Sequence, residues 1–160
     1  MKLVSLATST RHGRAPMPTF LSDGIRLAYL DEGPRDGDPI VLIHGFGSNS
    51  RVNWVATGWV DLLTKAGFRV IALDTRAHGA SEGPHDPALY DTRTCFAEDV
   101  ARLLDHLDID RADVMGYSHG AWITAHFACI HPERVRSALL GGLAMSMVTG
   151  LSDKIGRAHV

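Results

Sequence analysis

The sequence predicts one α/β domain in which helices cover both faces of a mostly parallel sheet. Short, continuously apolar segments recur along the chain, and each is followed by a segment whose apolar residues have helical spacing. Strands that alternate with helices are typical of a parallel sheet, because each parallel connection has to cross one face. The length of 160 residues fits a single domain.

The first predicted elements are a hairpin, a central strand and a helix. The turn SDG at 22–24 separates two strand signals, of which the second covers 25–30. The segment IVLIHG at 40–45 is apolar up to its His-Gly end, which suits a strand that is buried on both faces. Apolar residues then recur with helical spacing over 54–66, and Gly67 supplies the C-terminal stop.

The alternation continues into the second half of the chain. FRVIALD at 68–74 predicts a buried strand, and a glycine-rich loop leads from it to a helix over 92–107 with one apolar face. ADVMGY predicts the next strand, and the helix over 118–131 ends before Pro132. VRSALLGG, at 135–142, predicts the sixth strand.

Composition and charge restrict the classes of partner. Hydrophobic residues make up 45% of the chain, charged residues 21%, and the formal net charge is −2. Because Lys and Arg are scattered, we expect neither a nucleic acid nor a membrane surface as partner. The nine histidines do not form sets with metal-ligand spacing, so we predict no metal and no cofactor.

The cysteines indicate the cellular compartment. Cys95 and Cys129 can form one disulfide or remain as two thiols. The apolar run near the N-terminus is too short for a secretory signal. We therefore expect free thiols in a cytoplasmic protein, because reducing compartments keep thiols unpaired.

The pentapeptide GYSHG at 116–120 places Ser118 between a predicted strand and a predicted helix. In such a turn the serine backbone is strained, and Gly116 and Gly120 leave room for the chain to fold back closely. The hydroxyl then lies at the carboxyl end of the sheet, where open α/β folds bind ligands. A serine that only caps the helix is the alternative. The strand before the turn favours Ser118 as a catalytic nucleophile.

A second segment, IHGFGSNS at 43–50, supports the same chemistry. Gly45 lets the chain turn sharply after the central strand, so that the N–H of Phe46 can face Ser118. The N–H of His119, at the start of the helix, is a second donor. Two such donors hold the oxyanion that forms in acyl transfer. The alternatives are an ordinary glycine-rich loop and a phosphate-binding loop, but no Gly-x-x-Gly or Gly-Lys-Ser/Thr pattern follows.

Three motifs in order, HGFG, DTRAHGASEG and GYSHG, resemble the N-terminal part of the α/β-hydrolase fold family over about residues 18–145. This family includes esterases, lactonases, carbon–carbon bond hydrolases, epoxide hydrolases and haloperoxidase-like enzymes. The resemblance implies that Asp74 and Arg76 stabilise the loops around the site and take no step in the chemistry. Ala77 stands where glycine is usual, which predicts a backbone without positive φ at Ala77.

The serine at the elbow restricts the set of reactions that this resemblance implies. Family members that open epoxides or remove halides use an aspartate at the elbow, so Ser118 favours a small molecule with an acyl-type group. We therefore predict a serine hydrolase that acts on an ester-like substrate through an acyl-enzyme. Two alternatives remain open: a carbon–carbon bond hydrolase or haloperoxidase-like member with the same elbow, and a noncatalytic ligand-binding or interaction protein on this fold.

The catalytic base and acid follow the nucleophile in this family. No histidine after Ser118 is a favoured base, because the first three belong to the helix at the elbow and the last lies in the tail. These histidines are His119, His126, His131 and His159. His44 and His78 lie within loop motifs and are not favoured either.

The two ends of the chain carry separate predictions. Residues 1–16 resemble a poorly ordered leader. Residues 155–160, IGRAHV, match the translation of a common sequencing-adapter string and are predicted to be non-native, the alternative being a genuine C-terminus with this sequence. We expect an incomplete hydrolase domain at 17–154 that is truncated after about the sixth strand. Without acid and base, this fragment is expected to be inactive.

Overall fold

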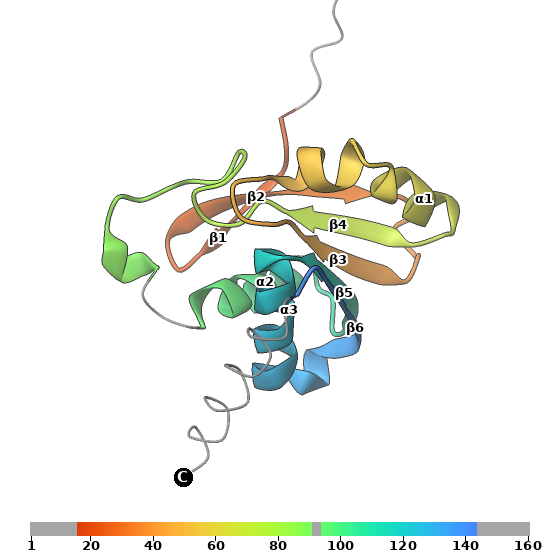
Figure 1. Cartoon of the computed structure of the whole chain (residues 1–160). Helices are drawn as coiled ribbons and strands as arrows, with labels where there is room; N and C mark the ends of the chain where they lie inside the picture. The colour runs from red at the N-terminus through yellow and green to blue at the C-terminus, as the bar shows by residue number, and fades with distance from the viewer. Residues whose placement is uncertain (1–15, 91–93, 144–160) are drawn as a thin grey trace, which may run out of the picture.

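The structure, a computed structural model of the chain, describes residues 16–90 and 94–143 (Figure 1). The strands are β1 (Thr19–Ser22), β2 (Ile25–Glu32), β3 (Pro39–Ile43), β4 (Arg69–Leu73), β5 (Ala112–Tyr117) and β6 (Val135–Gly141). They form one sheet in the order β1-β2-β4-β3-β5-β6. β3 to β6 run parallel, and the antiparallel hairpin of β1 and β2 joins them through β4. The predicted sheet is confirmed.

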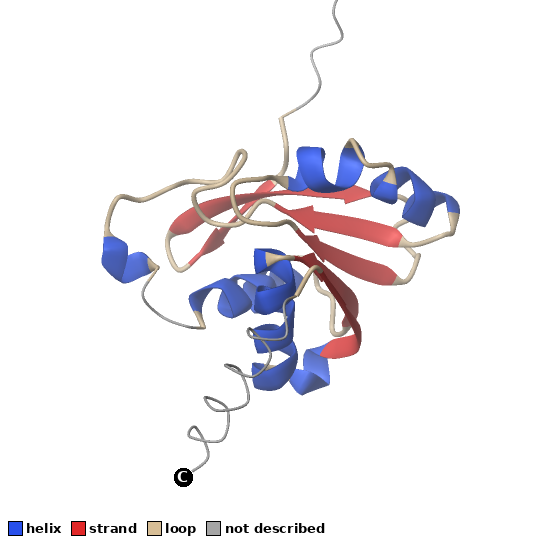
Figure 2. Ribbon diagram, viewed as in Figure 1, coloured by secondary structure: helices blue, strands red, loops and turns tan. Residues whose placement is uncertain are grey.

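Helices cover both faces of this sheet, as predicted. The helical elements are η1 (Arg51–Val55), α1 (Trp59–Lys65), η2 (Pro87–Leu89), α2 (Cys95–His106), α3 (His119–Ile130) and η3 (Pro132–Arg134). In Figure 1 and Figure 2, η1 and α1 lie on one face, and α2 and α3 lie on the other.

Side chains that alternate along the strands form two hydrophobic cores. In β3, Leu42 belongs to the core that contains Trp54 of η1 and Val60 of α1. Its neighbour Val41 belongs to the core that contains Leu104 of α2. Full burial of such a side chain contributes about 1.5–3 kcal/mol. Because β3 is buried on both faces, its sequence is apolar throughout.

The prediction of one continuous helix over 54–66 is wrong. A π-helical turn, η1, ends at Val55, and α1 begins only at Trp59. Gly58 stands between them with φ 84°, a left-handed conformation that interrupts helical hydrogen bonding. Leu62, one of the apolar residues of the predicted pattern, is 59% exposed.

The two later helices agree with their predicted positions. α2, Cys95–His106, lies within the predicted segment 92–107, whose first residues, 92 and 93, lie outside the described residues. Val100, Leu103 and Leu104 are fully buried on its inner face. α3 begins at His119, one residue later than predicted, because Ser118 is its N-cap.

The thiols and the ends of the described chain bear on the remaining predictions. Cys95 is buried and Cys129 is exposed, and both are free thiols, as expected. Within the described ranges, no helix has the length and apolar character needed to cross a membrane. The predicted leader, except for residue 16, and the predicted tail at 155–160 lie outside the described residues, so both stay predictions.

Candidate active site

Ser118 lies at the turn from β5 into α3. Its backbone has φ 53° and ψ −114°, outside the regions that residues with a side chain ordinarily adopt. A residue held in such a conformation costs about 1–3 kcal/mol. The strain expected for a serine nucleophile at this turn is therefore present.

Two glycines make this tight turn possible. A methyl group on Gly116 would overlap the carbonyl oxygen of Gly120, and a methyl group on Gly120 would overlap the carbonyl oxygen of Ile43. Both obstacles are backbone atoms, which cannot rotate away as a side chain can. The first turn of α3 therefore packs directly on β3 and β5, with no side chain between them.

The side chain of Ser118 does not serve as a helix cap. Ser118 is the N-cap residue of α3, but its hydroxyl makes no capping hydrogen bond. Its backbone N–H donates to the carbonyl of Gly141 at 2.8 Å, which ties the elbow to β6. A capping serine would instead accept a hydrogen bond from the first turn of the helix. This observation weakens the capping alternative and leaves the hydroxyl available for chemistry.

The loop that follows β3 lies against the elbow. A Cβ atom on Gly45 would lie 3.5 Å from the Cβ of Ser118 and 3.4 Å from the ring of Tyr117. The next residue, Phe46, has a side chain that is 80% exposed. His119 is the first residue of α3, and the first N–H groups of a helix have no acceptor within it. The structure thus brings the backbone segments of both predicted oxyanion donors close to Ser118.

The amides on either side of Phe46 are held by side chains. The N–H of Gly45 donates to Oδ1 of Asn53 at 3.0 Å, and the N–H of Gly47 donates to Nε2 of His78 at 3.2 Å. A backbone that is fixed on both sides presents the amide between them in one direction. We call the segment Gly45–Gly47 the oxyanion loop, after the role that the sequence predicts for the N–H of Phe46.

Three histidine rings gather around the oxyanion loop. The ring centroids of His44 and His78 are 5.1 Å apart, and the ring of Phe46 lies 5.5 Å from His78 and 6.1 Å from His119. Burial lowers the pKa of His44 and of His119, and the neighbouring His78 adds to this lowering. Both rings are therefore neutral at pH 7. The Nδ1 atom of His119 is buried without a hydrogen-bond partner among the described residues.

The other described histidines of this helix point to different partners. Nδ1 of His126 contacts the carbonyl of Trp122 at 3.0 Å, and Nε2 of His131 contacts Oε1 of Glu98 at 3.0 Å. In the part of the chain that the structure describes, no histidine is hydrogen-bonded to the hydroxyl of Ser118. A serine nucleophile needs a base within such reach. Among the described residues, no histidine is therefore in place to act as a base for Ser118.

Asp74 joins the loop after β4 to the loop after β3. Its carboxylate accepts hydrogen bonds from the N–H of Ser50 at 2.7 Å and from the N–H of Ala80 at 2.9 Å. The hydroxyl of Ser81 donates to the carbonyl of Asp74 at 2.6 Å. A side chain on Gly79 would overlap the same carboxylate, so glycine is required beside it. These contacts stabilise both loops.

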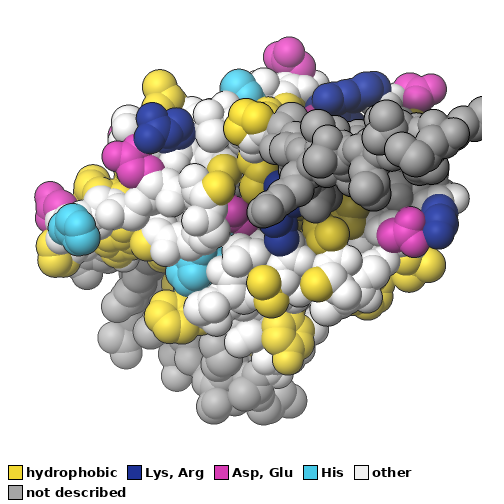
Figure 3. Space-filling view, turned by 90° about the horizontal axis from the view of Figure 1, so that it is seen from above, with side chains coloured by type: hydrophobic (Ala, Val, Ile, Leu, Met, Phe, Trp, Pro, Cys, Tyr) yellow, Lys and Arg dark blue, Asp and Glu magenta, His cyan; other side chains and the backbone are white. Residues whose placement is uncertain are grey.

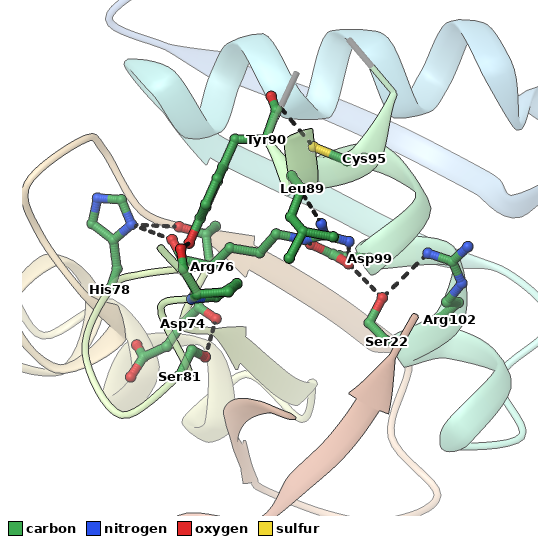
Figure 4. Close-up of polar contacts among 12 residues, drawn as sticks. Ser22, Asp74, Arg76, His78, Ser81, Leu89, Tyr90, Cys95, Asp99 and Arg102 are labelled. Carbon is green, nitrogen blue, oxygen red and sulfur yellow. Dashed lines mark hydrogen bonds and ion pairs between the residues drawn. The ribbon is translucent and has the colours of Figure 1, made fainter. Parts of the chain in front are cut away.

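Arg76 forms a buried ion pair with Asp99 of α2 (Figure 4). Its Nη1 also donates to the carbonyl of Leu89 at 2.6 Å. At the end of β1, the hydroxyl of Ser22 donates to the same carboxylate and lies 3.3 Å from Arg102. Burial raises the pKa of Asp99, whereas Arg76 and Ser22 favour its ionised form. The loop after β4, the first hairpin and α2 thus meet at one carboxylate.

The prediction that Ala77 has no positive φ is wrong, since its φ is 61°. The N–H of Ala77 donates to the carbonyl of Glu82 at 3.0 Å, which closes the loop around it. The left-handed conformation costs an alanine about 1–2 kcal/mol. A Cβ on Gly83 would lie only 3.1 Å from the Cα of Ala77, so the loop is packed tightly in this shape. The hydrogen bonds and packing of the loop offset the strain.

Sequence reasoning missed the partners that hold this site. The sequence contains a signal for Asp99, because this residue lies within the apolar pattern of a helix, where a carboxylate has to find a buried cation. The sequence contains no such signal for Asn53, because nothing in the spacing of the motifs connects it to Gly45. His78 was weighed only as a base, and its role as the partner of Gly47 has no sequence signal either.

The face of the molecule seen in Figure 3 is mixed in charge. Figure 3 shows acidic and basic side chains interspersed on one face, with hydrophobic side chains between them. Among the described residues, no group of three or more His, Cys, Asp or Glu side chains is arranged to hold a metal ion.

The fold and the elbow together define a family of proteins. Residues 38–157 match the alpha/beta hydrolase fold family. The chain therefore belongs to the α/β-hydrolase fold family, as its three motifs indicated.

Relatives and solved structures agree with this assignment. The chain is 38% identical over 123 residues to a non-heme chloroperoxidase of Streptomyces lividans, covering 74% of this chain and 41% of that protein. It is 38% identical over 127 residues to a 2-hydroxymuconate semialdehyde hydrolase of Pseudomonas sp. strain CF600, covering 78% and 42%. The crystal structure of epoxide hydrolase A from Mycobacterium thermoresistibile superimposes with a TM-score of 0.70 at 28% identity, covering 77% and 37%.

The chain spans about two fifths of the length of these curated relatives.

Proposed function

We propose that the chain is the nucleophile-bearing part of a cytoplasmic serine hydrolase that acts on a small ester-like or other acyl substrate. The observation that carries the proposal is the strained Ser118 at the carboxyl end of β5, with the oxyanion loop against it. The strained turn matters for the proposal, because it presents the hydroxyl of Ser118 above the carboxyl end of the sheet.

The proposed reaction has two halves. The Oγ of Ser118 attacks the carbonyl carbon of the substrate, and the N–H groups of Phe46 and His119 hold the oxyanion of the tetrahedral intermediate. The intermediate collapses to an acyl-enzyme and releases the alcohol. Water then attacks the acyl group and regenerates the serine. A histidine base, oriented by an Asp or Glu, takes the serine proton and gives it to the leaving alcohol. We propose that this histidine and its carboxylate partner are encoded after residue 154.

The acyl substrate is favoured over an epoxide for a chemical reason. A serine ester releases its acyl group to water with the help of an oxyanion hole, for which the proposed donors are the N–H groups of Phe46 and His119. The similarity to an epoxide hydrolase supports the fold of this proposal and not its substrate.

A second candidate reaction is favoured by the names of the relatives. One is a non-heme chloroperoxidase and another is a 2-hydroxymuconate semialdehyde hydrolase. A haloperoxidase-like or carbon–carbon bond hydrolase reaction would use the same Ser118 and the same oxyanion loop. Comparison of ester, vinylogous ketone and peroxide-dependent halogenation assays on the complete protein distinguishes these reactions.

The test begins with the gene. Long-read sequencing across the locus gives the natural codons after residue 154, and the complete protein is then expressed and treated with a fluorophosphonate probe. We expect labelling of wild-type protein, and none of Ser118→Ala. Ser137→Ala is the matched control, because Ser137 lies exposed on β6 and its hydroxyl contacts Asp113 at 2.8 Å.

Two outcomes would contradict the proposal. Well-folded complete protein that resists the probe would favour a noncatalytic ligand-binding or interaction protein on this fold. A natural gene without a later Asp or Glu and His would point the same way. The 160-residue chain alone is expected to hydrolyse esters near the background rate, since its described residues supply no base.

A further inference from the structure

His78 touches the oxyanion loop in two ways. Its Nε2 accepts the hydrogen bond from the N–H of Gly47 at 3.2 Å. Its ring also meets the ring of Phe46, at 5.5 Å between centroids and 75° between planes. One contact is thus with Phe46 itself and the other with the residue after it, in the loop between β3 and η1.

The other ring nitrogen of His78, Nδ1, contacts the loop after β4. Nδ1 of His78 lies 2.8 Å from the carbonyl of Arg76 and 3.2 Å from the hydroxyl of Thr75 (Figure 4). Arg76 is in turn fixed by its buried ion pair with Asp99. A rigid chain of contacts thus runs from α2 through His78 to Gly47.

These partners determine which nitrogen of the His78 imidazole carries the proton. An N–H of Gly47 can only donate, so Nε2 of His78 has to be an acceptor and carries no proton. The single proton of the neutral ring therefore lies on Nδ1, where the carbonyl of Arg76 accepts it. His44 repeats this arrangement, since its Nε2 accepts from the N–H of Thr75 at 3.1 Å and its Nδ1 contacts the carbonyl of Gly45 at 2.8 Å.

We propose that His78 is a positioning residue, which holds the oxyanion loop by accepting the hydrogen bond of Gly47 and thereby aims the N–H of Phe46 at the oxyanion. The proposal rests on the proposed serine hydrolase function. His78 does not touch the reacting atoms; it acts through the backbone of Gly47. Oxyanion stabilisation depends on donors that already point to where the charge develops, so a displaced N–H of Phe46 would stabilise the transition state less.

The test compares three variants in the complete protein. His78→Phe keeps an aromatic ring against Phe46 and removes the acceptor, so we expect kcat for an ester to fall roughly 10- to 100-fold with KM unchanged. His78→Gln supplies an amide oxygen that can accept from Gly47, and it is expected to recover most of kcat. His85→Phe is the matched control, because His85 is exposed and lies downstream in the same loop, and it should leave kcat unchanged.

A measurement that needs no activity separates this inference from the proposed function. Hydrogen exchange of the Gly47 amide, followed by NMR, is expected to quicken in His78→Phe and to stay slow in His78→Gln. If wild-type protein has no hydrolase activity but shows this pattern, the proposed function fails and the contact stands. If a folded His78→Phe variant keeps wild-type kcat, or if its Gly47 amide exchanges as slowly as in wild type, the positioning role is overturned.

Discussion

The guanidinium of Arg76 and the carboxylate of Asp99 meet edge to edge through two hydrogen bonds, Nε to Oδ2 at 2.7 Å and Nη2 to Oδ1 at 2.8 Å. Their side chains are 2% and 1% exposed. Such a two-point contact fixes both position and orientation. The loop that bears Asp74 and His78 is therefore anchored to α2 through one residue pair.

We expect Arg76→Met to destabilise the protein by about 3–5 kcal/mol, because it leaves the buried Asp99 carboxylate without the guanidinium that is directly paired with it. The double variant Arg76→Met, Asp99→Leu removes both charges and should recover much of that loss. The free energy of unfolding, measured in urea, tests both. Asp105→Asn is the control, since its 2.8 Å pair with Arg134 is exposed at the carboxylate and should cost less than about 1 kcal/mol. An Arg76→Met variant no less stable than this control would contradict the expectation.

Strain at Ser118 has a measurable effect on stability. Glycine adopts φ 53° without strain, whereas alanine does not. We expect Ser118→Gly to be more stable than Ser118→Ala by roughly 1 kcal/mol, after the greater chain entropy of unfolded glycine is subtracted. Both variants lack the hydroxyl, so lost activity does not affect the comparison. Equal melting temperatures would show that the turn is unstrained in solution.

Gly120 is expected to tolerate no side chain. In Gly120→Ala the new methyl group overlaps the carbonyl of Ile43, so α3 has to move away from β3 at a cost of about 1–3 kcal/mol or more. Gly24→Ala is the control, because a methyl group there would have no atom within 4 Å and only the φ of 79° is unfavourable. Chemical denaturation measures both. A Gly120→Ala variant as stable as Gly24→Ala would mean that the elbow is looser than described.

Acidification is expected to destabilise the fold through His44 and His119. Burial lowers the pKa of both rings, so below about pH 6.5 the unfolded chain binds protons that the folded chain does not. Stability is therefore full above the unfolded pKa and falls as pH drops toward the folded pKa. His119→Phe fits the aromatic surroundings of that ring and should reduce the loss between pH 7 and pH 5, whereas His85→Phe should not. An unchanged pH dependence in His119→Phe would count against a half-buried, neutral His119.

The strands and the elbow were predictable because their signals are local. A strand buried on both faces has a continuous apolar sequence, as β3 has, and Gly116 and Gly120 flank Ser118 within five residues. The break at Gly58 was missed, because apolar spacing does not reveal that a glycine has adopted a left-handed conformation.

The polar contacts of the site were harder to predict because they join distant segments. Gly47 and His78 are 31 residues apart, and Arg76 and Asp99 are 23 apart. The positive φ of Ala77 depends on the closed loop around it, and the residue type alone argued for the opposite. Only the packed fold brings these groups together.

The two thiols differ in exposure, so their rates of chemical modification can report local opening of α2. Cys129 is exposed near the end of α3, whereas Cys95 is buried at the first residue of α2. A thiol reagent should therefore modify Cys129 at once and Cys95 only when the start of α2 opens. Since Asp99 lies four residues further along α2, the slower modification rate measures how often the helix end beside the Arg76–Asp99 pair opens.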